Sequence, residues 1–157
     1  MKIKIEEAKR KDLNSILKLQ MELADYHREI DGKYYLSGKE RKDWFRKTFS
    51  KNFGKKNQKF LVAKVGKQVV GLMSGRIEKA KPYCREPKIG KISQACVTEK
   101  YRRKGIGRML FKKMLEWFKE KKIKFVEVSV DSRNKIGISA WKKFGFFEFQ
   151  KKMRLDL

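Results

Sequence analysis

The sequence is poor in the residues that build metal sites and disulfide frameworks. Its 157 residues include one histidine, His27, and two cysteines, Cys84 and Cys96. The cysteines do not form a CxxC pair, and so few potential ligands cannot assemble a typical zinc site. We therefore expect no bound metal, and reduced thiols such as those of a cytoplasmic protein.

Long apolar runs and linker segments are also missing. No stretch of ~18 apolar residues is present to cross a membrane, and the opening MKIKIEEAKRK lacks the apolar centre of a signal peptide. The chain has two prolines and no Pro/Gly/Ser-rich linker, internal repeat or low-complexity tail. These absences predict one domain over residues 1–157, located in the cytoplasm without membrane contact.

Acidic residues are few beside basic ones. Lysine and arginine number 43 against 18 aspartates and glutamates, which gives a formal net charge of +25. Such a surface concentrates anions, among them phosphates and nucleic acid, without selecting between them. Charge alone therefore predicts a non-specific nucleic-acid contact. No RNP, KH or helix-turn-helix pattern is present to read a base sequence.

Hydrophobic spacing predicts the order strand, helix, helix, strand, strand, strand, helix, strand, helix, strand. This order indicates an α/β (α+β) fold, with a mixed, mostly antiparallel sheet and helices on both faces. The expected strands cover residues 2–5, 59–65, 68–78, 89–97, 124–130 and 146–155. The expected helices begin after Asp12, at Ser37 with a capping box to Glu40, at Gly105, and near residue 137.

The spacing also predicts buried side chains and close backbone contacts. On the second helix, Trp44, Phe45 and Phe49 should share a buried face. The strands at residues 59–65 and 68–78 should form an antiparallel hairpin with a tight turn at Gly66 and Lys67. Within its second strand, Gly71 and Gly75 suggest a bulge or a close approach of another element. The helix after Gly105 should bury Ile106, Met109, Leu110, Met114, Trp117 and Phe118.

The stretch YRRKGIGRML, residues 101–110, lies between a predicted strand and a predicted helix. A helix that opens on Gly105 and Gly107 presents unpaired backbone N–H groups and the positive end of its dipole, an arrangement that binds anions. Neither GxxxxGK[ST] nor GxGxxG occurs here. Charge-assisted bonds to the same anion would come from Arg102, Arg103, Lys104 and Arg108.

These residues resemble the cofactor motif of the GCN5-related N-acetyltransferases, (Q/R)-x-x-G-x-(G/A), which Arg102, Gly105 and Gly107 match. The run from Asn134 to Phe146 is similar to the family signature N-x-x-A-I-x-x-Y-x-x-x-G-F. Together with the element order, the resemblance covers about residues 3–155. It implies a single GNAT-like N-acetyltransferase domain that uses acetyl-CoA as cosubstrate.

The resemblance also assigns roles to residues around the cofactor. Backbone N–H groups between Arg103 and Arg108 would hold the pyrophosphate, the strand end at residues 95–97 would align the pantetheine arm, and Asn134 would contact the arm near the thioester. The implied cofactor-binding set is Ala95, Cys96, Val97, Arg102, Arg103, Lys104, Gly105, Ile106, Gly107, Arg108 and Asn134.

The implied reaction is direct attack of an acceptor amine on the thioester carbonyl, without a covalent enzyme intermediate. An amine with a pKa near ~10 must lose a proton, so Glu127 and Glu78 are candidates for the base or for activating a water. Trp141 stands where the family most often has a tyrosine acid, and indole cannot take that role. Either another acid assists, among Tyr34, Tyr35 and Tyr83, or the protein binds the cofactor without catalysis.

The acceptor would be a small polyamine-like molecule or a protein amino group. The acidic segment between Glu22 and Asp31, in a region that lines the acceptor site in the family, suggests Asp25, Glu29 and Tyr34 as acceptor-binding residues. The alternative is a solvated helix face with pairing to Lys18 or Arg28. A basic nucleic-acid or ribosome-associated protein is the competing function, and the last strand is a candidate contact for a homodimer.

Overall fold

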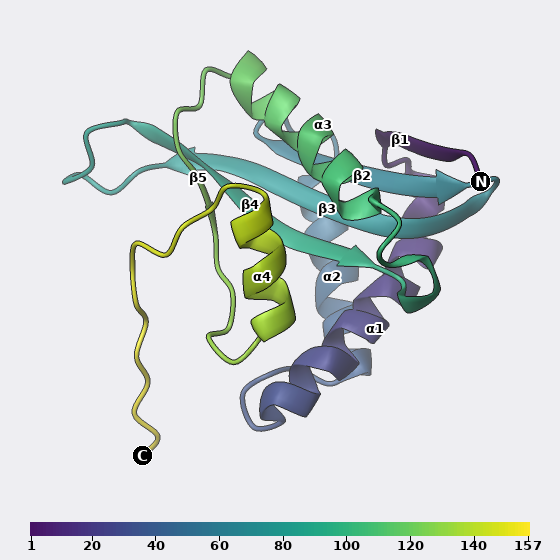
Figure 1. The fold of residues 1–157 in the computed structure, drawn as a ribbon, viewed down its shortest axis with the longest axis horizontal. Helices are drawn as coiled ribbons and strands as arrows, with labels where there is room; N and C mark the ends of the chain where they lie inside the picture. The colour runs from purple at the N-terminus through teal and green to yellow at the C-terminus, as the bar shows by residue number, and fades with distance from the viewer.

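The strands follow one another across one sheet in chain order, β1-β2-β3-β4-β5, in the computed structural model, which describes residues 1–157 (Figure 1). Their bounds are β1 Ile3–Glu7, β2 Gln58–Val65, β3 Gln68–Lys79, β4 Lys88–Val97 and β5 Val126–Val128. Neighbours pair antiparallel from β1 to β4, whereas β4 and β5 are parallel. The mixed, mostly antiparallel sheet predicted from the sequence is therefore confirmed.

Helices cover both faces of this sheet, as the sequence predicts. The α-helices are α1 Leu13–Asp31, α2 Gly38–Asn52, α3 Ile106–Glu120 and α4 Lys135–Lys143, with short 3₁₀ turns at Arg10–Asp12 and Glu99–Tyr101. In Figure 1, α3 crosses the near face of the sheet, while α1 and α2 lie behind it. No helix is both long enough and apolar enough to span a membrane.

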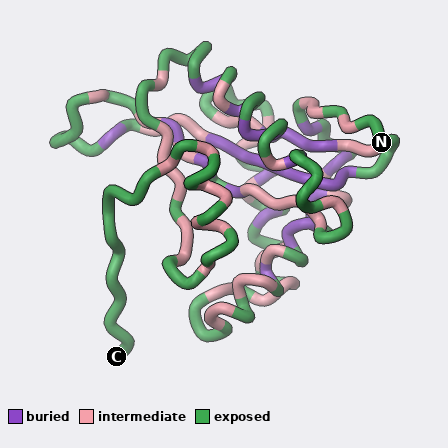
Figure 2. Tube along the Cα trace, viewed as in Figure 1, coloured by how far each residue is buried: buried purple, intermediate pink, exposed green.

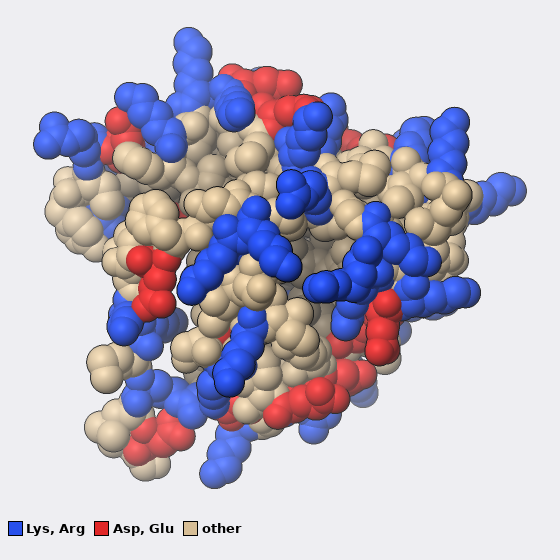
Figure 3. All heavy atoms as spheres, viewed as in Figure 1, with Lys and Arg blue, Asp and Glu red and all other residues tan.

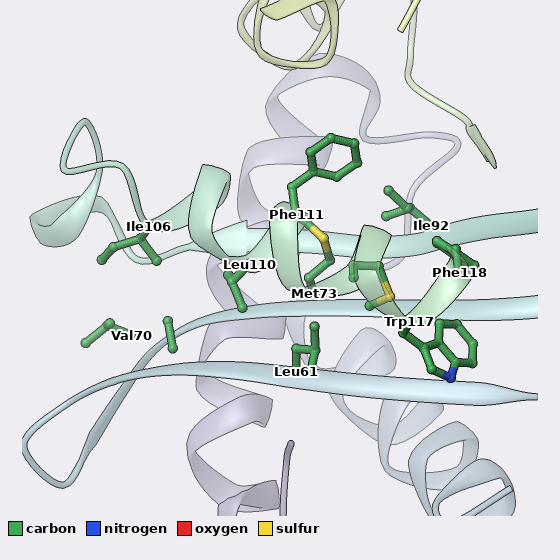
Figure 4. Close-up of a cluster of buried hydrophobic side chains, with 11 residues drawn as sticks. Leu61, Val70, Met73, Ile92, Ile106, Leu110, Phe111, Trp117 and Phe118 are labelled. Carbon is green, nitrogen blue, oxygen red and sulfur yellow. The ribbon is translucent and has the colours of Figure 1, made fainter. Parts of the chain in front are cut away.

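Two hydrophobic cores form because strand side chains alternate between the two faces. Leu61 and Ala63 of β2 pack under α3, whereas Phe60 and Val62 pack under α1 and α2. Figure 4 shows the first core, in which side chains from α3 meet those of the strands. Burial on both faces explains why the centres of β2 and β3 are almost continuously apolar (Figure 2).

Glycines let α3 lie close to the sheet. A Cβ at Gly75 would lie 2.7 Å from the sulfur of Met114, and one at Gly90 would lie 2.6 Å from a ring carbon of Phe118. The register of β3 and β4 also shifts at Ser74/Gly75. The close approach predicted from Gly75 is confirmed, and a bulge lies beside it.

The helices begin close to the positions predicted from the sequence. At α2 the predicted capping box forms, since the Glu40 N–H donates to Ser37 Oγ (3.2 Å) and the Ser37 N–H donates to a Glu40 carboxylate oxygen (2.9 Å). Asp12 directly precedes α1, but its carboxylate accepts the Lys9 N–H (2.8 Å) and pairs with Lys64 (2.8 Å). Its side chain therefore caps the preceding turn instead of α1.

Two predicted buried side chains are exposed. Met109 is 39% exposed and Trp44 is 44% exposed. On α3 the buried position belongs to Phe111, whose ring stacks on Phe144 just after α4 (centroids 4.8 Å apart). The helix period alone does not reveal that α4 packs beside α3, and so the predicted face included Met109 and left out Phe111.

The prediction of a last strand over residues 146–155 is wrong. After α4 the chain forms no strand, and it runs exposed away from the sheet (Figure 2). Its odd-numbered apolar side chains alternate like those of a half-buried strand, but Phe147 is 80% exposed and Met153 is 92% exposed. Alternation indicates which side of a strand is apolar, but it does not supply a partner strand, and β5 offers only three residues of edge.

Candidate active site

The site begins where β5 leaves β4. The two strands pair only at Gly90–Val126, Lys91–Glu127 and Ile92–Val128. Beyond this point β4 continues from Ser93 to Val97 with β3 on one side only. The bulge falls at the same place, because Gln94 lies opposite Ser74 and Ile92 lies opposite Gly75, which leaves Ser93 as the extra residue. The open edge of β4 can accept backbone-like hydrogen bonds from an extended ligand.

The turn that follows β4 presents free backbone N–H groups. Arg103 (φ 61°) and Gly105 (φ 77°) both have left-handed backbone conformations. From Arg103 to Arg108 no backbone N–H donates to a backbone acceptor, and the first helical bond is from Met109 N–H to Gly105 O (3.0 Å). Such a concave run of amides at a helix start binds phosphate-like anions.

Basic side chains surround these amides. Arg103, Lys104 and Arg108 are exposed, and Figure 3 shows lysines and arginines gathered over the turn before α3 and over α4. Arg102 does not point freely outward, because its Nε donates to the carbonyl of Val97 (2.9 Å). It therefore holds the turn against the end of β4, while the other cations remain available to an anion.

Asn134 lies at the start of α4. Its Oδ1 accepts from the Gly137 N–H (2.8 Å) and from the hydroxyl of Tyr26 on α1 (2.8 Å). A Cβ at Gly137 would lie 2.5 Å from Asn134 Nδ2, so this cap needs glycine three residues on. Both bonds use Oδ1, which leaves the amide N–H groups free to donate. The contact with Tyr26 was not predicted from the sequence.

A charged network ties the turn between α1 and α2 to the loop before α4. The Asp131 carboxylate accepts from the Tyr35 hydroxyl (2.7 Å) and from Arg133 (2.9 Å), and these bonds hold the pKa of Asp131 well below its usual range. Burial and the bond to Asp131 raise the pKa of Tyr35 to about 12. Asp31 accepts from Arg133 and, at 2.9 Å, from Arg154.

The three tyrosines considered as acids are not equally placed. Tyr35 is bonded to Asp131, Tyr34 is 55% exposed beneath the guanidinium of Arg154, and Tyr83 is 83% exposed in the loop between β3 and β4. Trp141 packs into an aromatic cluster, with Phe146 5.3 Å and Phe144 5.8 Å away between ring centroids. Its ring centroid is also 6.3 Å from that of Phe111 on α3, so the ring stabilises the contact between α4 and α3.

A pocket of about 280 Å³ opens on the other face of the sheet, beside the bulge. Its walls include Trp44, Thr48 and Asn52 of α2, and its floor includes Arg76, Ser93 and Gln94. No carboxylate lines it. The pocket thus reaches the point where β5 leaves β4 from the side opposite α3.

The two candidate bases lie near each other at the edge of this region. Lys91 Nζ is 2.7 Å from a Glu78 oxygen and 3.9 Å from a Glu127 oxygen. Partial burial opposes ionisation of Glu78, but hydrogen bonds from Lys91 and Arg76 outweigh it and lower the pKa of Glu78. Glu78 is therefore a poor proton acceptor. Glu127 has one longer ion pair and lies in the last paired stretch of β5.

Other predicted residues divide between the two faces. Ala95 and Val97 pack toward α3, whereas Cys96 packs toward α1 and α2, where burial raises the pKa of its thiol to about 12. A thiol held protonated in this way is not a nucleophile. Asp25 and Glu29 are exposed on α1 and do not line the pocket.

Comparison with known proteins shows the family and the fold of the chain. The sequence matches the family model described as the acetyltransferase (GNAT) family over residues 17–146. Among curated proteins no sequence matches the chain. Among solved structures, the fold is similar to a tetramutant of the BH1408 protein from Bacillus halodurans, with TM-score 0.86, 21% identity, and coverage of 98% of this chain and 99% of that one.

Aminoglycoside acetyltransferases also share the fold. The 6′-N-acetyltransferase AAC(6′)-Ih from Acinetobacter baumannii aligns with TM-score 0.78 and 15% identity over 99% of this chain and 98% of its own. AAC(6′)-Iy, in complex with the bisubstrate analogue CoA-S-monomethyl-acetylneamine, aligns with TM-score 0.77 and 12% identity over 100% of this chain and 99% of its own.

The free N–H groups of the turn after β4 and the open edge of β4 fit acetyl-CoA, whose diphosphate is anionic and whose pantetheine arm carries amides. The family match covers most of the chain, and the fold agrees with that of N-acetyltransferases. The chain therefore belongs to the GNAT family of acetyltransferases, which use acetyl-CoA as the acetyl donor.

Proposed function

We propose that this protein acetylates an amine at the point where β5 leaves β4. The observation that carries the proposal is that the open edge of β4 and the free amides after it lie at the same strand end. The amides from Arg103 to Arg108 would bind the pyrophosphate, and residues 95–97 would pair with the pantetheine arm. The free N–H groups of Asn134 would donate to a carbonyl of that arm.

The acceptor amine would reach the thioester from the pocket beside Ser93. Its nitrogen attacks the carbonyl carbon, the new C–N bond forms, the C–S bond breaks, and CoA leaves as the thiolate. The proton released by nitrogen goes to water held near Glu127, because Lys91 and Arg76 lower the pKa of Glu78 and leave it a weak base. The CoA thiol has a pKa of about 8.5, so it can leave without the acid that Trp141 cannot provide.

The experiment that tests this proposal uses two glycines with the same backbone strain. Gly105 (φ 77°) and Gly54 (φ 81°) both lie in open space, with no protein atom within 4 Å of an added Cβ. Alanine at either position has a similar conformational cost, but only Gly105→Ala adds a methyl group where the phosphate should lie.

We expect the wild type and Gly54→Ala to release CoA thiol with a panel of amines and to form acetylated products detected by mass. Gly105→Ala should bind acetyl-CoA at least about tenfold more weakly, because it loses charge-assisted bonds to the phosphates. Equal binding by both variants would contradict the proposed phosphate site. Binding without thiol release from any amine would favour the alternative of a cofactor-binding protein without catalysis.

A nucleic-acid contact, a homodimer and a cytoplasmic location remain proposals. The +25 charge supports the first, and a steep fall of affinity with salt, without base preference, would mark it as purely electrostatic. The exposed apolar side of residues 147–157 supports a dimer through the chain end. Removing this segment should then convert a dimer to a monomer in sedimentation measurements.

A further inference from the structure

One cation on the acceptor side of the sheet has no counter-charge. Arg41 of α2 is half-buried, and its guanidinium makes one hydrogen bond, from Nε to Gln20 Oε1 (3.1 Å). No carboxylate oxygen lies within 4.0 Å of it. Burial lowers the pKa of Arg41, but an arginine keeps its charge at neutral pH. An arginine in such a place usually has a carboxylate or phosphate partner.

The guanidinium is held in place by buried amides from two other elements. Gln20 of α1 is 0% exposed and Gln94 of β4 is 8% exposed, and Gln20 Nε2 donates to Gln94 Oε1 at 2.7 Å. Gln20 Oε1 then accepts from Arg41, so one continuous chain of bonds runs from β4 through α1 to α2. Gln94 directly follows the bulge at Ser93 and lines the acceptor pocket.

The two Nη groups of this guanidinium are unpaired. Nε donates to Gln20, and neither Nη group has an acceptor in the protein. Neither Nη group is fully buried, so both keep some contact with solvent. Next to Arg41 stands Trp44, a wall of the pocket, with its ring centroid 5.8 Å from the guanidinium carbon. Two unpaired Nη groups that keep some contact with solvent match the oxygens of a carboxylate or phosphate.

The other groups near Arg41 do not neutralise it. Burial and the charge of Arg41 both lower the pKa of His27, whose Nδ1 is buried without a hydrogen-bond partner. Cys96 stays protonated because burial raises its pKa to about 12. The only charged residue that lines the pocket, Arg76, is itself a cation, paired with Glu78 at 2.9 Å.

We infer that Arg41 binds an oxyanion, a carboxylate or a phosphate, carried by the acceptor amine. This inference rests on the proposed function and narrows its acceptor to a small amine that also bears an anionic group. A pocket of about 280 Å³ lies at the lower end of small-molecule sites. Cations around it also favour the neutral form of the amine, which is the form that attacks. A polyamine would meet Arg76 in the pocket lining and Arg41 beside Trp44, with no carboxylate in the lining.

The test compares matched acceptors of which one carries an anionic group and the other does not. The pairs are glycine and glycinamide, β-alanine and its amide, 4-aminobutyrate and its amide, and phosphoethanolamine and ethanolamine. Thiol release is compared per concentration of neutral amine, because the amides have lower amine pKa values. The N-acetyl product of each pair is also titrated by calorimetry, which reports binding without catalysis.

In at least one pair, we expect the anionic acceptor to have a kcat/KM at least about tenfold higher than its neutral partner. The N-acetyl product of that acceptor should also bind the protein at least about tenfold more tightly. Arg41→Gln should remove this preference, and Arg41→Lys should retain part of it. Arg46→Gln is the control, because Arg46 is an exposed arginine on the same helix. Acetyl-CoA affinity should be unchanged in all three variants.

The acceptor pair that shows a preference tells whether the oxyanion is a phosphate or a carboxylate. A preference confined to phosphoethanolamine supports a phosphate, and a preference for one amino acid supports a carboxylate. Equal rates and equal product binding within every pair, or a preference that survives in Arg41→Gln, would overturn the inference while leaving acetyl transfer intact. Failure of the proposed function would instead appear as no acetyl-CoA binding by the wild type.

Discussion

The donor end of the site is built from backbone groups, and the acceptor end is built from side chains. At the donor end, one continuous stretch from Arg103 to Arg108 supplies backbone N–H groups. At the acceptor end, side chains from α1, α2 and β4 meet through the bonds of Gln20 with Gln94 and Arg41. The first arrangement depends on backbone conformation, and the second depends on which side chains are present.

This difference predicts how each end responds to substitution. Most side-chain changes in the turn should leave its amides in place, whereas a change at a left-handed glycine should move them. At the acceptor end one substitution should change which amine is selected without affecting the donor. The shared scaffold between them is the contact of α3 with the sheet.

The largest effect should come from breaking that scaffold. Gly90→Ala places a Cβ 2.6 Å from the Phe118 ring, so α3 must move away from the sheet. We expect the free energy of unfolding to fall by about 1–3 kcal/mol, as overpacking does elsewhere. Denaturant unfolding measures this loss, and donor and acceptor binding should weaken together.

Gly32→Ala provides the control for that variant. Its Cβ would be 3.5 Å from the carbonyl oxygen of Arg28, an ordinary contact, and its backbone is right-handed. Stability should be unchanged or slightly higher. A Gly90→Ala protein as stable as this control would show that α3 is not held tightly on β4.

A second prediction concerns pH and the charged network that ties the turn between α1 and α2 to the loop before α4. Because the folded-state pKa of Asp131 is depressed, its stabilisation is complete above the unfolded pKa of about 3.9 and is lost as pH falls toward the folded value. Asp131→Asn should therefore be less stable than the wild type at pH 7, and the difference should shrink between about pH 4 and 2.

Urea unfolding at a series of pH values measures this difference. Asp25→Asn removes an exposed carboxylate on α1 and should show no comparable dependence. If the difference in the free energy of unfolding between Asp131→Asn and the wild type stays constant down to pH 2, the ionised carboxylate does not stabilise the loop.

The smallest effect should come from one side chain at the donor end. Arg108 is exposed, so Arg108→Gln should weaken acetyl-CoA binding by less than about fivefold, in line with exposed ion pairs. The loss should vanish at high salt. A loss as large as that in Gly105→Ala would show that side chains, and not amides, hold the anion.

The sequence predicted elements whose signals are local. The hairpin around Gly66, the capping box at Ser37 and the start of α3 at Gly105 each depend on neighbouring residues, and all three are present. Contacts between distant elements were not foreseen. Phe111 is buried in place of Met109 because α4 packs beside it, and the last strand is absent because its pattern specifies no partner.

The same distinction applies to the site. The phosphate-binding turn is one segment, so its motif could be recognised, and Asn134 could be placed at a helix start. Gln20 and Gln94 are 74 positions apart, and Tyr26 and Asn134 are 108 positions apart. No spacing pattern links such pairs, and Arg41 carries no motif of its own. The acidic segment around Asp25 looked suited to a cation, but it lies outside the pocket.

Hydrogen–deuterium exchange with and without CoA tests the central claim most directly, because the claim concerns backbone N–H groups. Saturating CoA should slow exchange at residues 93–97 and 103–108, and should leave the first turns of α2 unchanged. Unaltered exchange in both segments, or protection confined to the lysines of α4, would contradict the assignment of the donor site to the open end of β4.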